Sequence, residues 1–155
     1  MIKEGDEILG LKISSDCRGE IDLSALKGKN FVLYFYPKDN TPGCSLEAKA
    51  FSGLYKKFAE QNCEVIGVSN DTIVSHKKFK KLFELEHVLA TPQDDNFLKL
   101  FNVLQEKSMF GKKYFGIERS TFLVDSKGIV RKIWRKVKIF GHAQEVLNEL
   151  AKLNS

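Results

Sequence analysis

Two near-continuous apolar runs stand out along the chain, at residues 30–37 (NFVLYFYP) and 63–70 (CEVIGVSN). Runs of this kind are typical of strands that are buried on both faces of a sheet, as in parallel sheets covered by helices. Pro37 closes the first run. The pattern therefore predicts two buried central strands, and residues 87–92 (HVLATP) predict a third.

Apolar residues recur at helical spacing after each of these runs. From Pro42 to about Glu60 this spacing predicts an amphipathic helix. Residues 71–84 predict a second helix, residues 94–104 a short third one, and the C-terminal segment a closing helix. The predicted apolar stripes are Leu46, Ala50, Leu54 and Phe58 with Phe51 and Tyr55 in the first helix, His76, Phe79 and Phe83 in the second, and Ala143, Val146, Leu147, Leu150 and Leu153 in the last.

Two further segments read as paired strands. Residues 11–24 predict two short strands around a turn at residues 16–19, and residues 120–134 predict a hairpin around a Ser-Lys-Gly turn. The order of strands, helices and hairpins predicts an α/β fold with a mixed sheet and helices on both faces. With 155 residues, we expect a single domain over residues 1–155.

Composition indicates the cellular compartment in which the protein is expected to work. No apolar stretch approaches the ~20 residues that a membrane-spanning helix needs. The N-terminus, MIKEGDEILG, carries acids where a signal peptide would carry basic and then apolar residues. The cysteines Cys17, Cys44 and Cys63 are odd in number and form no CxxC pair, which favours a reducing compartment over a disulfide framework. We expect a cytoplasmic protein without membrane contact.

The net charge of +5 comes mainly from two basic segments, KKFKK (77–81) and RKIWRKVK (131–138). Basic stretches that contain an aromatic residue can bind nucleic acid. No nucleic-acid-binding motif accompanies them, so solvated surfaces are the favoured interpretation. A non-enzymatic redox sensor, or a protein that binds nucleic acid or another acidic partner, stays open as an alternative function.

Cys44 has an unusual position, at the predicted start of the helix that follows the first buried strand. Thr41 suits the N-cap and Pro42 the first helical position, which places Cys44 third in the helix. A sulfur there faces free N–H groups and the positive end of the helix dipole, and both favour the thiolate anion. Cys44 is therefore a candidate nucleophile, although a lone cysteine is more often an inert core residue.

Three segments carry a resemblance to a known family. YFYPKDNTPGCSLEAKAF (34–51) resembles the active-site signature of peroxiredoxins, in particular the bacterioferritin-comigratory or Q-type branch. VSNDTIVSHKKF (68–79) and EKSMFGKKYFGIERSTFLVD (106–125) are similar to later segments of that branch. The resemblance implies a thioredoxin-like fold, reduction of hydrogen peroxide and organic hydroperoxides, no cofactor, and reducing power from thioredoxin or a related thiol.

The resemblance also assigns roles to single residues. Cys44 matches the peroxidatic nucleophile, and Thr41 matches the hydroxyl that binds the thiolate and the incoming peroxide. Pro37 matches the residue that covers the pocket, and Arg119 matches the guanidinium beside the sulfur. Glu47 resembles a polar neighbour of that arginine.

The chemistry requires more than an ionised thiol. Complete ionisation of a thiol with a pKa near ~8.5 gains at most ~30-fold at neutral pH, or about 2 kcal/mol. The remainder must come from donors aimed at the breaking O–O bond. Arg119, Thr41 and the backbone N–H groups of Gly43 and Cys44 are the candidates, so Gly43 and Glu47 are expected to contact or border the substrate.

No resolving cysteine is apparent. Many members of this branch have one five residues after the first, where this chain has Lys49, and residues 71–86 contain none. A straight helix would separate Cys44 from Cys63 by roughly 24 Å, far more than a disulfide allows. Cys17 is expected to be a bystander. We therefore expect a one-cysteine cycle in which thioredoxin, glutaredoxin or a small thiol reduces the Cys44 sulfenic acid.

Other kinds of site find no support in the sequence. His76, His87 and His142 lack metal-ligand spacing, the acids are scattered, and no metal is expected. His76 is interpreted as a helix residue at the core boundary. A thiol–disulfide oxidoreductase is disfavoured because CxxC is absent. The family resemblance favours a monomer, and the shape of residues 104–117 is left open.

Overall fold

The computed structural model describes residues 1–8 and 10–155 of the chain. The helices within these residues are η1 (Leu23–Leu26, a 3-10 turn), α1 (Pro42–Gly53), α2 (Tyr55–Glu60), α3 (Ile73–Phe83), α4 (Asp95–Leu100) and α5 (His142–Leu153). The strands are β1 (Lys12–Ser15), β2 (Gly19–Asp22), β3 (Asn30–Phe35), β4 (Cys63–Val68), β5 (Val88–Pro92), β6 (Leu104–Met109), β7 (Lys112–Ile117), β8 (Ser120–Val124) and β9 (Val130–Trp134).

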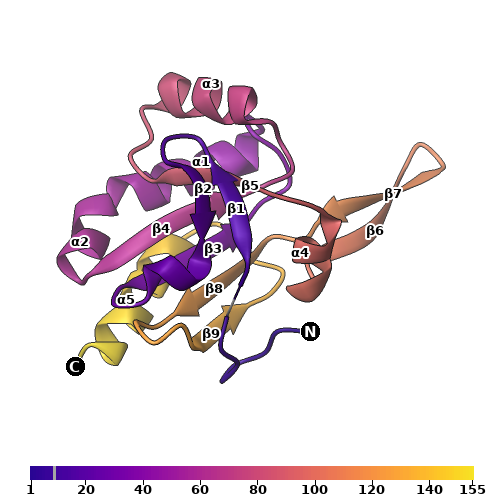
Figure 1. Cartoon of the computed structure of the whole chain (residues 1–155). Coiled ribbons are helices and arrows are strands. Elements are labelled where there is room, and N and C mark those ends of the chain that lie inside the picture. Colours follow the sequence, from indigo (N-terminus) through magenta and orange to yellow (C-terminus); the bar gives the residue numbers. More distant parts are fainter. Residues whose placement is uncertain (9) are drawn as a thin grey trace.

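In the described part of the chain, the central sheet has seven strands in the order β2-β1-β5-β4-β3-β8-β9 (Figure 1). Strands β3, β4 and β5 run parallel, and β1, β2, β8 and β9 extend the sheet by antiparallel pairing. This is the predicted mixed α/β sheet of a thioredoxin-like fold. The β1–β2 hairpin, the three buried strands and the β8–β9 hairpin are confirmed.

Alternating side chains of β3 supply two separate cores. Phe31, Leu33 and Phe35 join a cluster on one face, which also holds Phe97 and Leu98 of α4. Val32 and Tyr34 join the cluster on the other face, which is completed by side chains of α1, α2, α3 and α5. Helices therefore cover both faces of the sheet, as predicted.

The long helix predicted from Pro42 to Glu60 is in fact two helices. Leu54 separates α1 from α2, with φ −102° and ψ 8°. The predicted stripe is also partly wrong, because Leu46 is 65% exposed and Ala50 is exposed, whereas Phe51 and Phe58 are buried. The buried face of α1 instead consists of Cys44, Ser45, Glu47, Ala48 and Phe51. A pattern of apolar residues could not reveal this face, because it includes a buried glutamate.

Two other segments differ in detail from the sequence interpretation. The helix predicted over residues 94–104 is shorter, because α4 ends at Leu100 and β6 begins at Leu104. Residues 104–117, whose shape was left open, form the β6–β7 hairpin, which projects away from the central sheet (Figure 1). Among the described helices, none combines the length and the apolar character needed to cross a bilayer.

Candidate active site

The first turn of α1 presents Cys44. Thr41 is the N-cap, with φ −95° and ψ 154°, and Pro42 is the first helical residue, as predicted. Cys44 is therefore the third residue of the helix, and its side chain is only 2% exposed. This helix follows directly on the loop after β3, so the sulfur lies near the carboxyl ends of the parallel strands, where open α/β sheets usually place their sites.

Arg119 approaches the sulfur from a distant part of the chain. It immediately precedes β8, and β8 runs antiparallel to β3 with Ser120 opposite Phe35. The residue before β8 therefore lies at the edge of the sheet where β3 ends. Its Nη2 atom lies 3.3 Å from Sγ of Cys44 and donates a hydrogen bond to it. This contact is the geometry that a developing negative charge on a peroxide oxygen would also use.

Glu47 holds the other side of the same guanidinium. Its Oε1 atom accepts a hydrogen bond of 2.6 Å from Nη1 of Arg119, one turn of α1 beyond Cys44. Burial raises the pKa of Glu47 to about 7, although the Arg119 cation works in the opposite direction. Burial disfavours the Arg119 cation, but Glu47 and Cys44 outweigh it and raise the pKa of Arg119. The charged guanidinium of Arg119 is thus held in place by hydrogen bonds to two side chains of α1, those of Glu47 and Cys44.

Gly43 provides room for this bridge. A Cβ atom at Gly43 would lie 3.1 Å from Cδ1 of Ile139 and 3.4 Å from Nη2 of Arg119. The first of these separations is tighter than ordinary van der Waals contact, so a side chain at Gly43 would press on Ile139 and approach the guanidinium. The absence of a side chain therefore lets Arg119 and residue 139 close over the helix start.

Thr41 and Pro37 lie in the loop between β3 and α1, and their surroundings differ from those of Cys44 and Arg119. The Thr41 hydroxyl donates to the carbonyl oxygen of Lys38 at 2.9 Å and so closes the turn before α1. Pro37 is exposed and follows Tyr36 directly after β3. The structure therefore brings together Cys44, Arg119, Glu47 and Gly43, while the roles of Thr41 and Pro37 toward a peroxide stay predictions.

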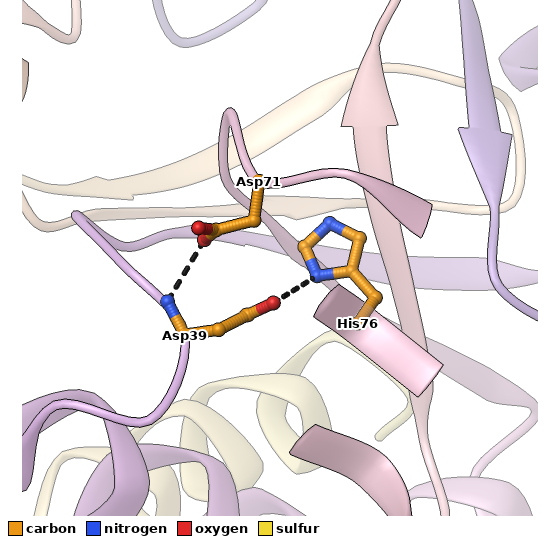
Figure 2. A group of neighbouring side chains, drawn as sticks. All are labelled: Asp39, Asp71 and His76. Atoms are coloured by element: carbon orange, nitrogen blue, oxygen red, sulfur yellow. Dashed lines mark hydrogen bonds and ion pairs between the residues drawn. The ribbon is translucent and has the colours of Figure 1, made fainter. Parts of the chain in front are cut away.

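A buried polar network fixes the loop that leads into α1, and its central residue is Asp39 (Figure 2). Its Oδ1 atom accepts from the Tyr36 hydroxyl at 2.5 Å. Its Oδ2 atom accepts from the Ser75 hydroxyl at 2.8 Å and lies 2.8 Å from Nδ1 of His76. Burial is the largest influence and opposes ionisation, but the hydrogen bonds from His76, Tyr36 and Ser75 outweigh it and lower the pKa of Asp39.

His76 joins this loop to the sheet. Its Nε2 atom lies 3.1 Å from the carbonyl oxygen of Ala90 in β5, and a carbonyl can only accept a hydrogen bond. The other ring nitrogen, Nδ1, faces the Asp39 carboxylate. Asp39 and His76 therefore form a buried hydrogen-bonded pair that links the loop after β3 to α3 and β5. His76 is fully buried, so its interpretation as a core-boundary residue is wrong.

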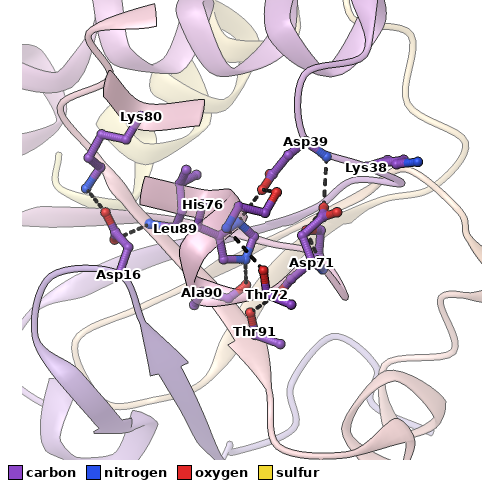
Figure 3. A network of polar contacts seen from close by, with 12 residues as sticks. Asp16, Lys38, Asp39, Asp71, Thr72, His76, Lys80, Leu89, Ala90 and Thr91 are labelled. Atoms are coloured by element: carbon purple, nitrogen blue, oxygen red, sulfur yellow. Dashed lines mark hydrogen bonds and ion pairs between the residues drawn. The ribbon is translucent and has the colours of Figure 1, made fainter. Parts of the chain in front are cut away.

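Asp71 ties the same loop to its neighbours (Figure 3). Its Oδ2 atom accepts from the backbone N–H of Asp39 at 2.8 Å and from the Ser69 hydroxyl at 2.6 Å. Its own carbonyl accepts from the Thr91 hydroxyl. The loops after β3 and β4 are therefore joined to each other and to strand β5.

Asp39, Asp71 and His76 also form the one group of acids and histidines in the described residues that is compact enough for a metal ion, with ligand atoms within 4.8 Å of one another. Each carboxylate oxygen at its centre already accepts hydrogen bonds from protein donors. The donor set fits a hydrogen-bond network better than a cation site. Sequence reasoning missed this group, although Asp39 and His76 lie within two of the segments that carry the family resemblance.

The other two cysteines have different environments. Cys63 begins β4 and is buried, its thiol donates to the carbonyl oxygen of Glu64, and burial raises its pKa. Cys17 is exposed in the turn between β1 and β2, and burial of part of the thiol raises its pKa. All three cysteines are free. The distance of roughly 24 Å expected between Cys44 and Cys63 assumed one straight helix. That assumption is wrong, because the helix breaks at Leu54.

Comparison with known proteins agrees with this geometry. Residues 5–133 match the model of the AhpC/TSA family. The chain is 42% identical to Peroxiredoxin Bcp of Bacillus subtilis, over 99% of this chain and 98% of that protein.

Solved structures give the same result. The structure of the Xanthomonas campestris bacterioferritin comigratory protein, described with alkyl peroxide reduction activity, aligns with a TM-score of 0.88 and 37% identity over 97% of this chain and all of that one. A cysteine-to-serine mutant of Xylella fastidiosa PrxQ aligns with a TM-score of 0.93 and 37% identity, over 100% of this chain and 99% of that one. The chain therefore belongs to the AhpC/TSA family, within its Bcp and PrxQ peroxiredoxins.

Proposed function

We propose that this peroxiredoxin reduces hydrogen peroxide and organic hydroperoxides at Cys44. The observation that carries the proposal is the contact of 3.3 Å between Arg119 Nη2 and Cys44 Sγ at the N-terminus of α1. One guanidinium there neutralises the thiolate and offers N–H donors to an oxygen beside it. Arg119 is held in place by Glu47, so this donor is in position before substrate arrives.

In the first step the Cys44 thiolate attacks one peroxide oxygen. The S–O bond forms as the O–O bond breaks, and the leaving hydroxide or alkoxide takes a proton to become water or an alcohol. The sulfur is oxidised to a sulfenic acid and the peroxide is reduced. Arg119 and the N–H groups of the first turn of α1 stabilise the charge that moves to the leaving oxygen. Thr41 is proposed to direct the peroxide, and Pro37 to shield the pocket.

The cycle is proposed to close with an external thiol. The thiol sulfur attacks the sulfenic sulfur of Cys44, a mixed disulfide forms, and water leaves. A second thiol then releases Cys44. This version is supported by Lys49, which stands where a resolving cysteine is frequent in this branch, and by the burial of Cys63. Thioredoxin, glutaredoxin or a small thiol would serve as the reductant. We further propose that the enzyme is a single-domain monomer and that it works in the cytoplasm.

Trapping the oxidised protein tests the proposal. After one equivalent of hydrogen peroxide, a sulfenic-acid reagent followed by peptide mass spectrometry should label Cys44, and the Cys44→Ser variant should consume no peroxide. If Cys44→Ser retains wild-type peroxide consumption, the peroxidase proposal is overturned. A stoichiometric disulfide from Cys44 to Cys17 or Cys63 would overturn only the one-cysteine version.

A further inference from the structure

Residues 135–141, here called the strap, run from the end of β9 to α5 and border the active site. The backbone N–H of Val137 donates to the carbonyl oxygen of Arg119 at 3.0 Å. Ile139 lies against Gly43, the residue before Cys44, with its Cδ1 atom 3.1 Å from the position of a Cβ there. The strap therefore contacts residues on both sides of the sulfur, and a molecule that reaches Cys44 from this direction must pass over it.

The strap forms part of an open cleft of about 620 Å³, which lies between the end of β9 and the start of α5. Its walls carry four cationic side chains, Lys132, Arg135, Lys136 and Lys138, and a single carboxylate, Glu145. This is the second basic segment of the sequence, and the cleft adjoins the active site through Val137, whose backbone contacts Arg119. A positively charged cleft raises the local concentration of anionic groups.

Most of this charge is available to a ligand. Among the residues that the structure describes, no carboxylate lies within 4.0 Å of the amino groups of Lys132, Lys136 or Lys138. Arg135 differs, because Nη1 donates to the carbonyl oxygens of Phe101 and Asn102 and anchors the strap. These lysines are thus free of carboxylate partners, although Lys132 belongs to β9 and its amino group lies 6.0 Å from the centre of the Trp134 ring. Arg135 fixes the strap, which carries Lys136 and Lys138.

An apolar anchor stands beside these lysines. Phe140 lines the same cleft and its side chain is fully exposed. A fully exposed aromatic ring that adjoins a charged rim is a common feature of protein contact surfaces. Small neutral peroxides need neither the ring nor the charges. A protein that docks over the cleft would use both.

We propose that the strap is the docking surface for a protein dithiol reductant that carries carboxylates around its reactive cysteines. The inference rests on the proposed function, because a Cys44 sulfenic acid without a resolving cysteine needs an external thiol. Charge complementarity with the three free lysines selects an acidic partner and speeds its encounter. One cysteine of the partner displaces water from the sulfenic acid, and its second cysteine then attacks the mixed disulfide, which returns Cys44 and leaves the partner as a disulfide.

The test separates the two half-reactions. In a Cys17→Ser background, Cys44 is oxidised with one equivalent of hydrogen peroxide, and its reduction is followed with two synthetic Cys-Gly-Pro-Cys peptides, one flanked by glutamates and one by glutamines. The peptides represent acidic and neutral reductant surfaces. The variants are Lys136→Glu with Lys138→Glu, and Phe140→Ser. The matched charge control is Lys112→Glu with Lys113→Glu on β7, in the projecting hairpin.

The expected result is a charge-dependent reduction rate. At low salt the acidic peptide should reduce the wild-type protein about tenfold faster than the neutral one, and about 0.5 M salt should abolish the difference. The strap lysine variant should lose this preference, the β7 variant should keep it, and Phe140→Ser should slow both peptides.

Three outcomes overturn the inference. The first is equal rates for the two peptides in the wild type. The second is a strap lysine variant that slows peroxide oxidation and both peptides alike, which would make the strap a structural part of the site. The third is strap-dependent retention of duplex DNA with an unchanged peptide preference, which would favour nucleic acid as the ligand. Failure of Cys44 to form a sulfenic acid at all would instead reject the proposed function.

Discussion

Arg119 follows Cys44 by 75 residues in the chain, yet its Nη2 atom lies 3.3 Å from the Cys44 sulfur. The antiparallel direction of β8 makes this possible, because it returns the start of that strand to the edge where β3 ends. The two nitrogens of the fork have separate partners, since Nη1 binds Glu47 and Nη2 binds Cys44. The pairing fixes both the charge and its orientation.

Arg119→Lys should slow the oxidation of Cys44 by hydrogen peroxide by about 10²- to 10³-fold, the usual cost of removing one positioned donor at a developing oxyanion. A lysine keeps the charge but cannot bind Glu47 and Cys44 at the same time through a planar fork. Stopped-flow measurement of sulfenic acid formation checks this, with thermal unfolding as a control for folding. A loss of less than threefold would mean that charge alone suffices.

Glu47→Gln should change how stability depends on pH. The pKa of Glu47 is about 7 in the folded protein against an ordinary value of 4.5, so the folded state binds the proton more tightly. Ionising this buried carboxyl therefore costs stability as the pH rises from about 4.5 to about 7. The glutamine variant lacks that cost.

The free energy of unfolding of Glu47→Gln, minus that of the wild type, should therefore become more positive across this window, by roughly 3 kcal/mol at most. Urea unfolding of both proteins at several pH values provides the measurement. The same substitution at Glu60, an exposed residue at the end of α2, is the control for replacing a glutamate by glutamine. A pH-independent difference at Glu47 would contradict its burial as a titrating group.

The Asp39–His76 pair should influence the rate of peroxide reduction without touching the substrate. Asp39→Asn or His76→Gln leaves a buried polar partner with an unsatisfied hydrogen bond, which costs about 1–3 kcal/mol of stability. Because the pair anchors the loop that starts α1, Cys44 oxidation should also slow by about tenfold at temperatures where the variants are folded.

The two substitutions combined should be far less harmful than their sum, since each removes the same pairing. A double-mutant cycle on both unfolding free energy and Cys44 oxidation rate measures this coupling. Ser75→Ala, which removes one hydrogen bond to Asp39 and no charge, is the milder control. Strict additivity would show that the pair does not act as a unit.

His87 should make the fold sensitive to acid. It is fully buried, its Nε2 atom lies 2.6 Å from the Tyr34 hydroxyl, and burial lowers its pKa from 6.5 to about 3. The folded state keeps the ring neutral while the unfolded state takes up a proton, so stability falls as the pH drops from 6.5 toward 3.

Between pH 6.5 and pH 4 this effect amounts to about 3 kcal/mol. His87→Gln, which retains an acceptor for Tyr34, should therefore lose less stability over that interval than the wild type. Denaturant unfolding of the wild type and of His87→Gln at both pH values measures these losses of stability. Equal losses in both proteins would assign the acid sensitivity to other groups.

Much of the fold could be predicted because the pattern of apolar residues along the chain indicates which segments are buried. The run from Asn30 to Phe35 has no polar interruption after its first residue and lies inside the sheet, between β4 and β8. In α5 the predicted residues Ala143, Val146, Leu147 and Leu150 are buried, but Leu153 is only half-buried, and the buried His142 was not expected. The face of α1 could not be predicted in this way. Glu47 is buried because Arg119, far along the chain, supplies its partner, and a local pattern counts such a residue as exposed.

The same difference between local and long-range information applies to the candidate site. Cys44 could be placed third in its helix from Thr41 and Pro42 alone, because the preference of proline for the first helical position is a local property, although Thr41 makes no side-chain capping bond. The proximity of Arg119 was implied by resemblance and depends on strand direction, which spacing does not reveal. The Asp39–His76 pair was missed for the same reason, since it joins the loop after β3 to helix α3, which only the parallel order of β3, β4 and β5 brings together.

The near-complete enclosure of Cys44 has a consequence for the order of events in turnover. A molecule of two oxygen atoms is small enough to reach a sulfur that is barely open to solvent, whereas a peptide or protein thiol needs the groups around the sulfur to move aside before an S–S bond can form. The proposed reduction therefore requires an opening that oxidation by hydrogen peroxide does not. The rate of that opening would limit turnover when the reductant is abundant.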